Sequence, residues 1–288
     1  MCRRFLPFFC AVLALLLQGA SVNAREALLH QFFVGDTAVW VLSLGWKEDP
    51  TTILRPASEE DKAILVRDYP QGKVRNSQNV LLIRDKKHVI LVDAGPAQSA
   101  DELYASLLRA GTSPEAVTHV ILTHAHADHT GGLVRGGKAA FPRASILFPK
   151  AEIDYWLNPA NKASAPKGSE HLFTEIPKLL EMYGKRVFSF TPGSELFADL
   201  PGVQAVNAPG HTPGHVGVTV SSGGKTFLFW GDLLHAYDVQ TALPDMASAY
   251  DMNPTEAARS RKALLERARA GGWLACGAHV PFVQPREL

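Results

Sequence analysis

The segment that most constrains this chain lies between residues 124 and 129, where the sequence reads His-Ala-His-Ala-Asp-His. Imidazole and carboxylate groups are the side chains that bind zinc in proteins, and four of them occur here within six residues. In extended backbone, residues two apart project to the same side, so His124 and His126 can hold one ion together. Asp128 and His129 come from the turn that follows and can face a second ion. The segment therefore predicts a metal site.

Three further candidate ligands share one local context, at the end of a predicted strand or beside a glycine turn. His211 follows a glycine, Asp232 follows Phe-Trp-Gly, and His279 follows Cys-Gly-Ala. Loops over a rigid sheet commonly carry the functional residues of α/β proteins. Five histidines and two aspartates would serve two ions if one carboxylate bridges them. We expect His215 to support or pack against the site, because the neighbouring ligand position is already filled by His211.

The predicted strands occur mostly as hairpins. Apolar, β-branched runs at 80–83 and 88–92 flank one polar turn, and runs at 216–220 and 226–230 flank a Ser-Ser-Gly-Gly turn. A fifth short run at 118–123 leads directly into the histidine cluster.

Helices are predicted between these strands. One covers 99–110 and stops at Gly111, and another begins with the cap sequence Asn253-Pro254 and continues to about residue 270. A last strand is expected at 273–276, with Cys276 as a small buried hydrophobic residue, and 158–170 is expected to be a surface loop. Hairpins that alternate with helices favour a layered α/β protein.

Residues 1–24 have the pattern of a signal peptide. Arg3 and Arg4 precede an apolar run at 5–17, and small residues at 22–24 provide a cleavage site. The apolar run is short for a membrane span, so export to the periplasm or the medium is favoured over a retained anchor. The remaining residues, 25–288, would form one domain of 264 residues.

The charge of the chain excludes some classes of partner. Cleavage would remove two arginines and no acids, so the formal charge would change from +1 to −1. A nearly neutral chain gives no electrostatic reason to expect nucleic acid or an anionic membrane as a partner, and no integral membrane partner is implied. We expect a small-molecule substrate, and the sequence leaves a homodimer open.

The ordered set of candidate ligands resembles the metallo-β-lactamase superfamily. Asp93, in the sequence Leu-Val-Asp-Ala-Gly, also resembles that family's first motif, whose aspartate supports the metal loop. The resemblance implies a four-layer αβ/βα sandwich with two divalent ions, zinc by expectation, at one edge of the two sheets. It further implies that one ion is held by His124, His126 and His211, that the other is held by Asp128, His129 and His279, and that both are bridged by Asp232.

Within the superfamily, the chain is similar to the methyl parathion hydrolase branch, which shares much with the N-acyl-homoserine lactonases. The resemblance covers about 79–279 and is carried by the segments 140–144, 152–157, 210–215 and 261–272. There are two departures. Nine residues follow His279, which leaves open whether a further strand closes the second sheet. The third position after Asp232 is His235, with Tyr237 nearby, where the lactonases tend to have a tyrosine.

The resemblance implies hydrolysis of a lactone or ester, with phosphotriester turnover as a side activity. Two cations lower the pKa of a shared water, so that a metal-bound hydroxide can attack near neutral pH. The bridging carboxylate Asp232 argues against a β-lactamase. Two alternatives remain: a mono-iron oxidoreductase of the persulfide dioxygenase type, and a non-catalytic metal-binding module.

Two residues are candidate catalytic groups and three aromatic residues are candidate pocket residues. Asp128 is expected to orient the attacking water, and His235 to protonate the leaving alkoxide. Phe148, Tyr155 and Trp156 either line an apolar pocket for the leaving group or acyl chain, or pack a helix onto the sheet.

Overall fold

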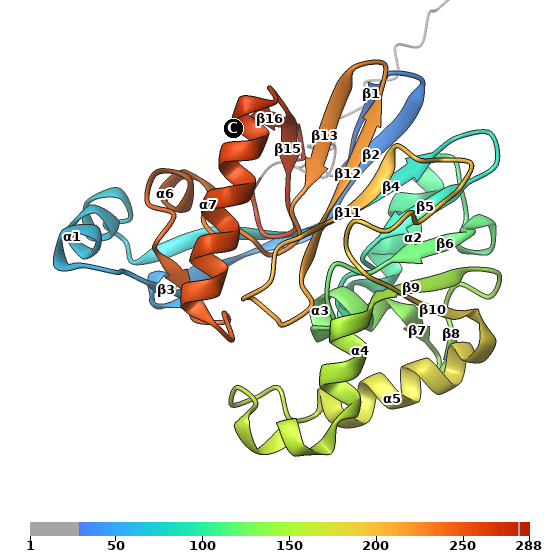
Figure 1. Ribbon diagram of the computed structural model, residues 1–288, viewed down its shortest axis with the longest axis horizontal. Helices are drawn as coiled ribbons and strands as arrows, with labels where there is room; N and C mark the ends of the chain where they lie inside the picture. Colours follow the sequence, from blue (N-terminus) through green and yellow to red (C-terminus); the bar gives the residue numbers. More distant parts are fainter. Residues whose placement is uncertain (1–28, 282) are drawn as a thin grey trace, which may run out of the picture.

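Two β-sheets form the centre of the protein, whose computed structural model describes residues 29–281 and 283–288. The predicted signal peptide at 1–24 lies outside the described residues. The sheets face one another, and helices cover the outer face of each (Figure 1). Across the described ranges, the structure contains no helix with the length and apolar character needed to span a membrane.

The first sheet has seven strands of mixed direction. In spatial order they are β1 (Leu29–Val34), β2 (Thr37–Pro50), β4 (Lys73–Arg84), β5 (Val89–Val92), β6 (His119–Ile121), β9 (Ser145–Pro149) and β10 (Val187–Phe190). The strands from β1 to β5 pair antiparallel, whereas β5, β6, β9 and β10 run parallel.

The second sheet has five strands. They are β11 (Val203–Asn207), β12 (Val216–Ser222), β13 (Lys225–Phe229), β15 (Leu274–Cys276) and β16 (Arg286–Glu287). Since β12 is antiparallel to both β11 and β13, and β15 is parallel to β13, the strands β11, β13 and β15 all point the same way. Their carboxyl ends therefore meet at one edge of the sheet.

Two short ribbons, seven α-helices and six short 3₁₀ helices complete the described part of the chain. The ribbons pair β3 (Leu54–Arg55) with β14 (Ala247–Ser248), and β7 (Val134–Arg135) with β8 (Lys138–Ala139). The α-helices are α1 (Glu59–Asp68), α2 (Ala100–Arg109), α3 (Ala127–Thr130), α4 (Lys150–Leu157), α5 (Leu172–Tyr183), α6 (Tyr237–Ala242) and α7 (Pro254–Ala270).

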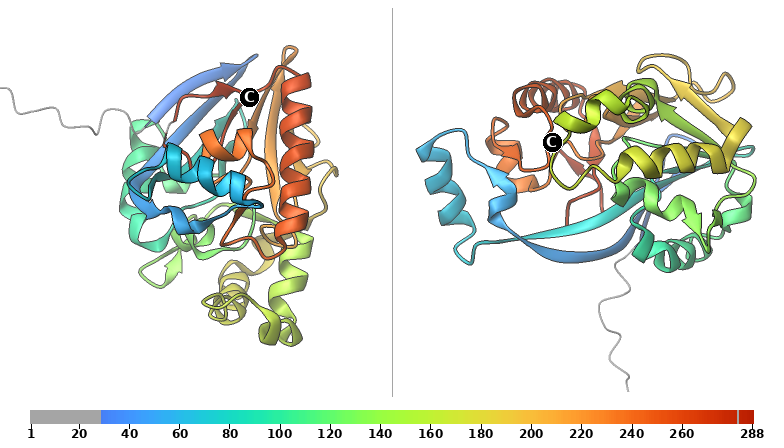
Figure 2. Two further views of the ribbon diagram at one scale, coloured as in Figure 1. Left: turned by 90° about the vertical axis from the view of Figure 1, so that its left-hand side faces the viewer. Right: turned by 90° about the horizontal axis from the view of Figure 1, so that it is seen from below.

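The apolar core consists of layers that match this arrangement. One cluster lies between the two sheets and continues to Leu264, Leu265 and Ala268 of α7, on the outer face of the second sheet. A second cluster joins the outer face of the first sheet to α2, α4 and α5. Figure 2 shows α7 along the second sheet, with α2 on the far side of the first. The predicted four-layer αβ/βα sandwich is confirmed.

The two predicted hairpins are present as β4–β5 and β12–β13, and the strand before the histidine cluster is β6. Helix α2 ends before Gly111, which has φ of 73°. Helix α7 begins as predicted, because the Asn253 side chain accepts a hydrogen bond from the Glu256 amide and Pro254 occupies the first helical position. Cys276 is fully buried at the end of β15.

Three features differ from the sequence-based expectations. Strand β4 begins at Lys73, seven residues before the apolar run at 80–83, because its first half pairs with the far half of β2 beyond a register shift at Ser43–Trp46. The predicted loop 158–170 contains a 3₁₀ helix at Pro159–Ser164. The closing edge of the second sheet is occupied by the two-residue strand β16, which pairs antiparallel with β15.

Candidate metal centre

The candidate ligands all lie at the edge where the carboxyl ends of β6, β11, β13 and β15 meet (Figure 1). His124 and His126 are in the loop after β6, and Asp128 and His129 are in the short helix α3 that follows. The other three ligands, His211, Asp232 and His279, lie in the loops after β11, β13 and β15. Parallel strands from two sheets thus bring residues 155 positions apart to one place.

Four of these residues form a first ligand group: His124, His126, His211 and Asp232. His211 Nε2 is 3.3 Å from Asp232 Oδ2 and 3.0 Å from His126 Nδ1. His124 Nε2 is 3.8 Å from the same carboxylate oxygen. Tetrahedral zinc with bonds of about 2.0–2.1 Å holds its ligand atoms about 3.3 Å apart, so these separations suit one ion.

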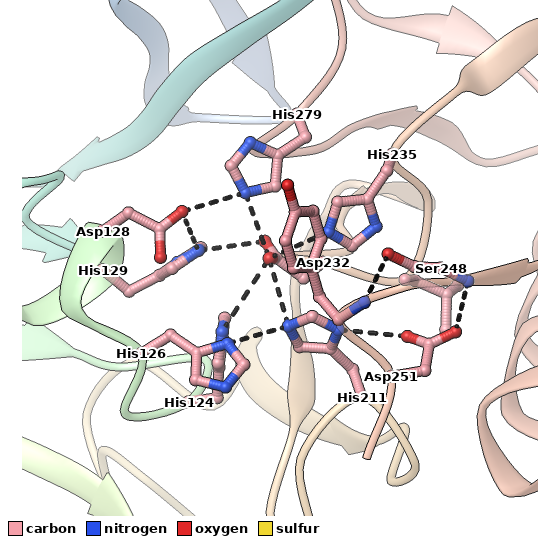
Figure 3. Close-up of polar contacts among 12 residues, drawn as sticks. His124, His126, Asp128, His129, His211, Asp232, His235, Ser248, Asp251 and His279 are labelled. Carbon is pink, nitrogen blue, oxygen red and sulfur yellow. Dashed lines mark hydrogen bonds and ion pairs between the residues drawn. The ribbon is translucent and has the colours of Figure 1, made fainter. Parts of the chain in front are cut away.

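The second group consists of Asp128, His129, His279 and again Asp232 (Figure 3). His129 Nε2 is 3.0 Å from Asp232 Oδ1, and His279 Nε2 is 3.1 Å from Asp232 Oδ2. Asp128 Oδ2 is 3.2 Å from His279 Nε2 and 3.6 Å from His129 Nε2. Asp232 is the only described residue that belongs to both groups.

Unsatisfied polar atoms also fit a pair of bound cations. His124 Nε2, His129 Nε2 and Asp232 Oδ1 are buried and make no well-aligned hydrogen bond, although the last two atoms are only 3.0 Å apart. A buried polar atom without a partner is costly, and two ions would satisfy these atoms, one at His124 and one at His129, with Asp232 shared between them. The donor set of imidazole nitrogens and carboxylate oxygens suits a divalent metal of the zinc type.

The first sheet fixes the second group through Asp93. This residue has φ of 62°, the only described non-glycine residue with a positive φ, and it is fully buried. One carboxylate oxygen accepts hydrogen bonds from the Thr123 hydroxyl and from His129 Nδ1, each at 2.8 Å. The other oxygen accepts from the Thr123 amide at 2.8 Å. Asp93 therefore turns Nε2 of His129 towards the site.

Two further histidines, His211 and His279, are oriented in the same way, through Nδ1. His211 donates to Asp251 at 3.1 Å, and His279 donates to the Ser77 carbonyl at 3.0 Å. Asp251 is in turn held by the Ser248 amide (Figure 3). The buried guanidinium of Arg261 also donates to it. Such outer contacts fix the tautomer and the direction of a ligating imidazole.

His215 lies outside both groups. Its Nδ1 donates to the Ala208 carbonyl at 2.9 Å, and its Nε2 accepts from the Asp232 amide at 2.9 Å. Burial lowers the pKa of His215 to about 3, so the ring is neutral and can accept this bond. It thus holds the backbone of Asp232 rather than pointing into the site.

The carboxylates raise the proton affinity of several ligands when no ion is present. Burial alone would lower the pKa of His211 and His279, but Asp232 with Asp251 raises the first to about 9, and Asp232 with Asp128 raises the second to about 10. The pKa of His129 is raised by Asp232 and Asp93 against the same burial. By contrast, burial lowers the pKa of His126 to about 3. These protons occupy the place that cations would take.

A cleft of about 410 Å³ opens over the two groups. Besides the ligands it is lined by His235, by Tyr250, by the strand residues Lys47 and Asn76, and by the segment 166–169. His235 Nε2 is 3.4 Å from Asp232 Oδ2, and its ring stacks on His279 with centroids 5.0 Å apart. Asp128, which is partly exposed, faces the same cleft.

The three candidate pocket aromatics do not line this cleft. Trp156 and Phe148 are buried in the core between the first sheet and its helices, with Tyr155 packed against them. The pocket role is therefore wrong and the packing role is right. Tyr237 stacks on Trp230 and is also absent from the cleft lining.

Sequence reasoning missed the residues that do line the cleft. Lys47 and Asn76 reach it because β2 and β4 extend past the register shift, and Tyr250 because the loop after β14 folds over His235 with ring centroids 5.5 Å apart. Asp251 was also missed, although its place two residues before the helix cap Asn253 was a usable signal.

Comparisons with known proteins agree with this geometry. The family model of the metallo-β-lactamase superfamily matches residues 74–279. Among curated proteins, the chain is similar to metallo-β-lactamase domain-containing protein 1 of Xenopus laevis, with 32% identity over 168 residues, 57% of this chain and 59% of that protein. The chain thus spans less than two thirds of that relative's length.

Two solved structures are similar over almost the whole chain. One is the hydrolase AbOPH of the β-lactamase superfamily, with a TM-score of 0.79, 26% identity and coverage of 91% of this chain and 93% of that one. The other is AidC, a dizinc quorum-quenching lactonase in complex with its product, with a TM-score of 0.78, 27% identity and coverage of 88% and 91%. With the family match extending over well more than half of its length, this chain belongs to the metallo-β-lactamase superfamily.

Proposed function

We propose that this protein is an exported hydrolase with two zinc ions that opens a lactone or cleaves an ester. The observation that carries the proposal is that Asp232 belongs to two complete groups of four ligands. A carboxylate in that position can hold two cations side by side. The likeness to AidC, a dizinc lactonase, supports a lactone as the substrate. A complete second group supports a hydrolase with two ions over an oxidoreductase with a single iron.

The roles of the residues follow from where they face. Two bound cations would supply a water of lowered pKa and would polarise the carbonyl oxygen under attack. Asp128 is partly exposed at the floor of the cleft, where its carboxylate can orient that water. His215 and Asp251 lie behind the ligands and would keep them in place.

His235 is the candidate group at the leaving oxygen. It lines the cleft, and its Nδ1 is buried without a hydrogen-bond partner. Burial lowers the pKa of His235, so the ring is neutral at pH 7 in the ion-free protein. A neutral ring that donates one N–H hydrogen bond to the leaving alkoxide is therefore our refined proposal for its role.

Two finer points belong to the same proposal. Export is supported by the basic residues Arg3 and Arg4 and by the apolar run at 5–17. Phosphotriester turnover as a side activity is supported by chemistry alone, since the same pair of cations would polarise a phosphoryl oxygen as readily as a carbonyl oxygen.

One screen tests the proposal. The mature chain is purified, its metals are counted, and lactones, aryl esters, phosphotriesters and β-lactams are assayed in parallel. We expect about two ions per chain and the highest kcat/KM on a lactone. His211→Ala and His279→Ala, which each remove a ligand from one group, serve as inactive controls. A full metal complement with no hydrolysis of any class would refute the hydrolase.

A further inference from the structure

Glu152 is a fully buried acidic residue that belongs to neither ligand group. It is the third residue of α4, beneath the loops that carry the first group. A carboxylate in a protein core is costly unless hydrogen bonds replace its lost water. The groups around Glu152 should therefore show what stabilises its buried carboxylate.

Three donors satisfy the Glu152 carboxylate. Oε2 accepts from the Ala125 amide at 3.0 Å and from the Trp156 indole at 3.0 Å. Oε1 accepts from the Gly214 amide at 2.7 Å. Trp156 lies one turn further along the same helix, whereas Ala125 and Gly214 are in the two ligand loops.

These two loops come from different sheets. Ala125 lies between His124 and His126, after β6 of the first sheet. Gly214 lies three residues after His211, in the loop between β11 and β12 of the second sheet. One carboxylate therefore spans the two halves of the fold at the point where three ligands of the first group converge.

Gly214 permits the close approach that this bridge requires. A Cβ atom at that position would lie 2.6 Å from the Glu152 amide nitrogen and 2.9 Å from its Oε1. Any larger residue would push the loop away from α4. Gly214 and the Glu152 carboxylate together therefore set the distance between this loop and α4.

The second ligand group has separate supports. His129 is held by Asp93 and His279 by the Ser77 carbonyl, and Asn79 donates to the carbonyls on either side of that loop. Within the described part of the chain, Glu152 makes no hydrogen bond or ion pair with this set of residues. A change at Glu152 should therefore affect one ion and not the other.

We propose that Glu152 is a positioning residue that sets the separation of the two loops holding the ion of His124, His126 and His211. The inference rests on the proposed function for the presence of two ions. Glu152 joins a loop of the first sheet to a loop of the second sheet, and it would thereby fix the positions of the ligands around one of those ions.

The test is Glu152→Gln, which keeps the size of the side chain. A carboxamide has one acceptor oxygen, so its NH₂ group must face at least one of the three donors. Cobalt(II) is titrated into ion-free protein against a competing chelator, with His211→Ala and His279→Ala defining the visible spectrum of each remaining ion. We expect the affinity of the first ion to fall by about 10- to 100-fold and that of the second to stay unchanged.

The matched control is Trp156→Phe. It removes the indole donor from Glu152 Oε2 and leaves in place the hydrogen bonds from the Ala125 and Gly214 amides to the carboxylate. We expect wild-type affinity for both ions. Unchanged affinity in Glu152→Gln, equal weakening of both ions, or the same loss in Trp156→Phe would each overturn the inference.

A second variant decides the matter if Glu152→Gln does not fold. Gly214→Ala leaves the carboxylate intact and presses a methyl group against Glu152. The same selective loss of the first ion supports the inference, and wild-type affinity for both ions contradicts it. If wild-type protein binds fewer than two cobalt ions, the proposed dinuclear centre fails, while the comparison on the remaining ion still decides the role of Glu152.

Discussion

Asp93 Oδ2 lies 2.8 Å from Nδ1 of His129, and both side chains are fully buried. The contact links the strand end of β5 to the helix that carries the second ligand group. Since Asp93 has φ of 62°, its side chain reaches His129 only from a backbone conformation that few residues tolerate. The orientation of one ligand thus depends on an unusual backbone turn in another strand.

Asp93→Asn should weaken the second ion without unfolding the protein. Asparagine tolerates a positive φ. Its NH₂ group, however, must face at least one of the groups that now donate a hydrogen bond to the Asp93 carboxylate. We expect about 10- to 100-fold weaker binding of one ion, measured by chelator competition. Retention of wild-type affinity for both ions would show that Asp93 does not orient His129.

Metal binding should release protons at pH 7. In the ion-free protein the pKa of His211 is about 9 and that of His279 about 10, and the pKa of His129 is also raised. All three are protonated at pH 7 and must lose a proton to bind an ion, so affinity should rise as pH increases towards those values. Calorimetry in buffers of different ionisation enthalpy should show about three protons released per chain. A heat of binding that is independent of buffer would contradict this.

Gly231→Ala should destabilise the fold and disturb Asp232. The glycine has φ of 57°, and a Cβ there would lie 2.7 Å from His215 Nε2 and 3.0 Å from Thr123 Cβ. We expect a loss of about 2 kcal/mol or more in the free energy of unfolding, measured by urea titration. Gly224→Ala is the matched control, with φ of 74° and nothing within 4 Å of the added Cβ. Equal losses in the two variants would show that backbone strain alone is responsible.

Tyr250→Ala should raise KM more than it lowers kcat. The ring lines the cleft beside His235 and is 44% exposed, so a substrate can cover it. Loss of that apolar contact should cost about 1 kcal/mol of binding, or roughly a fivefold rise in KM, on a lactone with an acyl chain. Tyr237→Ala, outside the cleft lining, is the comparison. A fall in kcat with KM unchanged would instead place Tyr250 in the chemical step.

The candidate metal ligands could be predicted from local signals, whereas the four-layer sandwich was implied by the resemblance to the metallo-β-lactamase superfamily. The spacing from His124 to His129 and the glycines beside Asp232 and His279 are visible in the sequence, and the hairpins follow from apolar runs around polar turns. These features require no knowledge of which strand pairs with which.

The substrate cleft could not be predicted, because it depends on contacts between distant segments. Lys47 and Asn76 reach it only through the long pairing of β2 with β4, where the apolar pattern is weak. Trp156 was ambiguous for a related reason. The rotation of α4 on the sheet decides whether its indole faces the cleft or the core, and the structure turns it towards Glu152.

An anomalous difference map from crystals of the zinc-loaded protein tests directly whether Asp232 bridges two metal ions. We expect two peaks about 3.5 to 4 Å apart, with one oxygen of Asp232 directed at each. One peak would lie among His124, His126 and His211, and the other among Asp128, His129 and His279. A single peak, or two peaks that Asp232 does not bridge, would contradict the dinuclear centre.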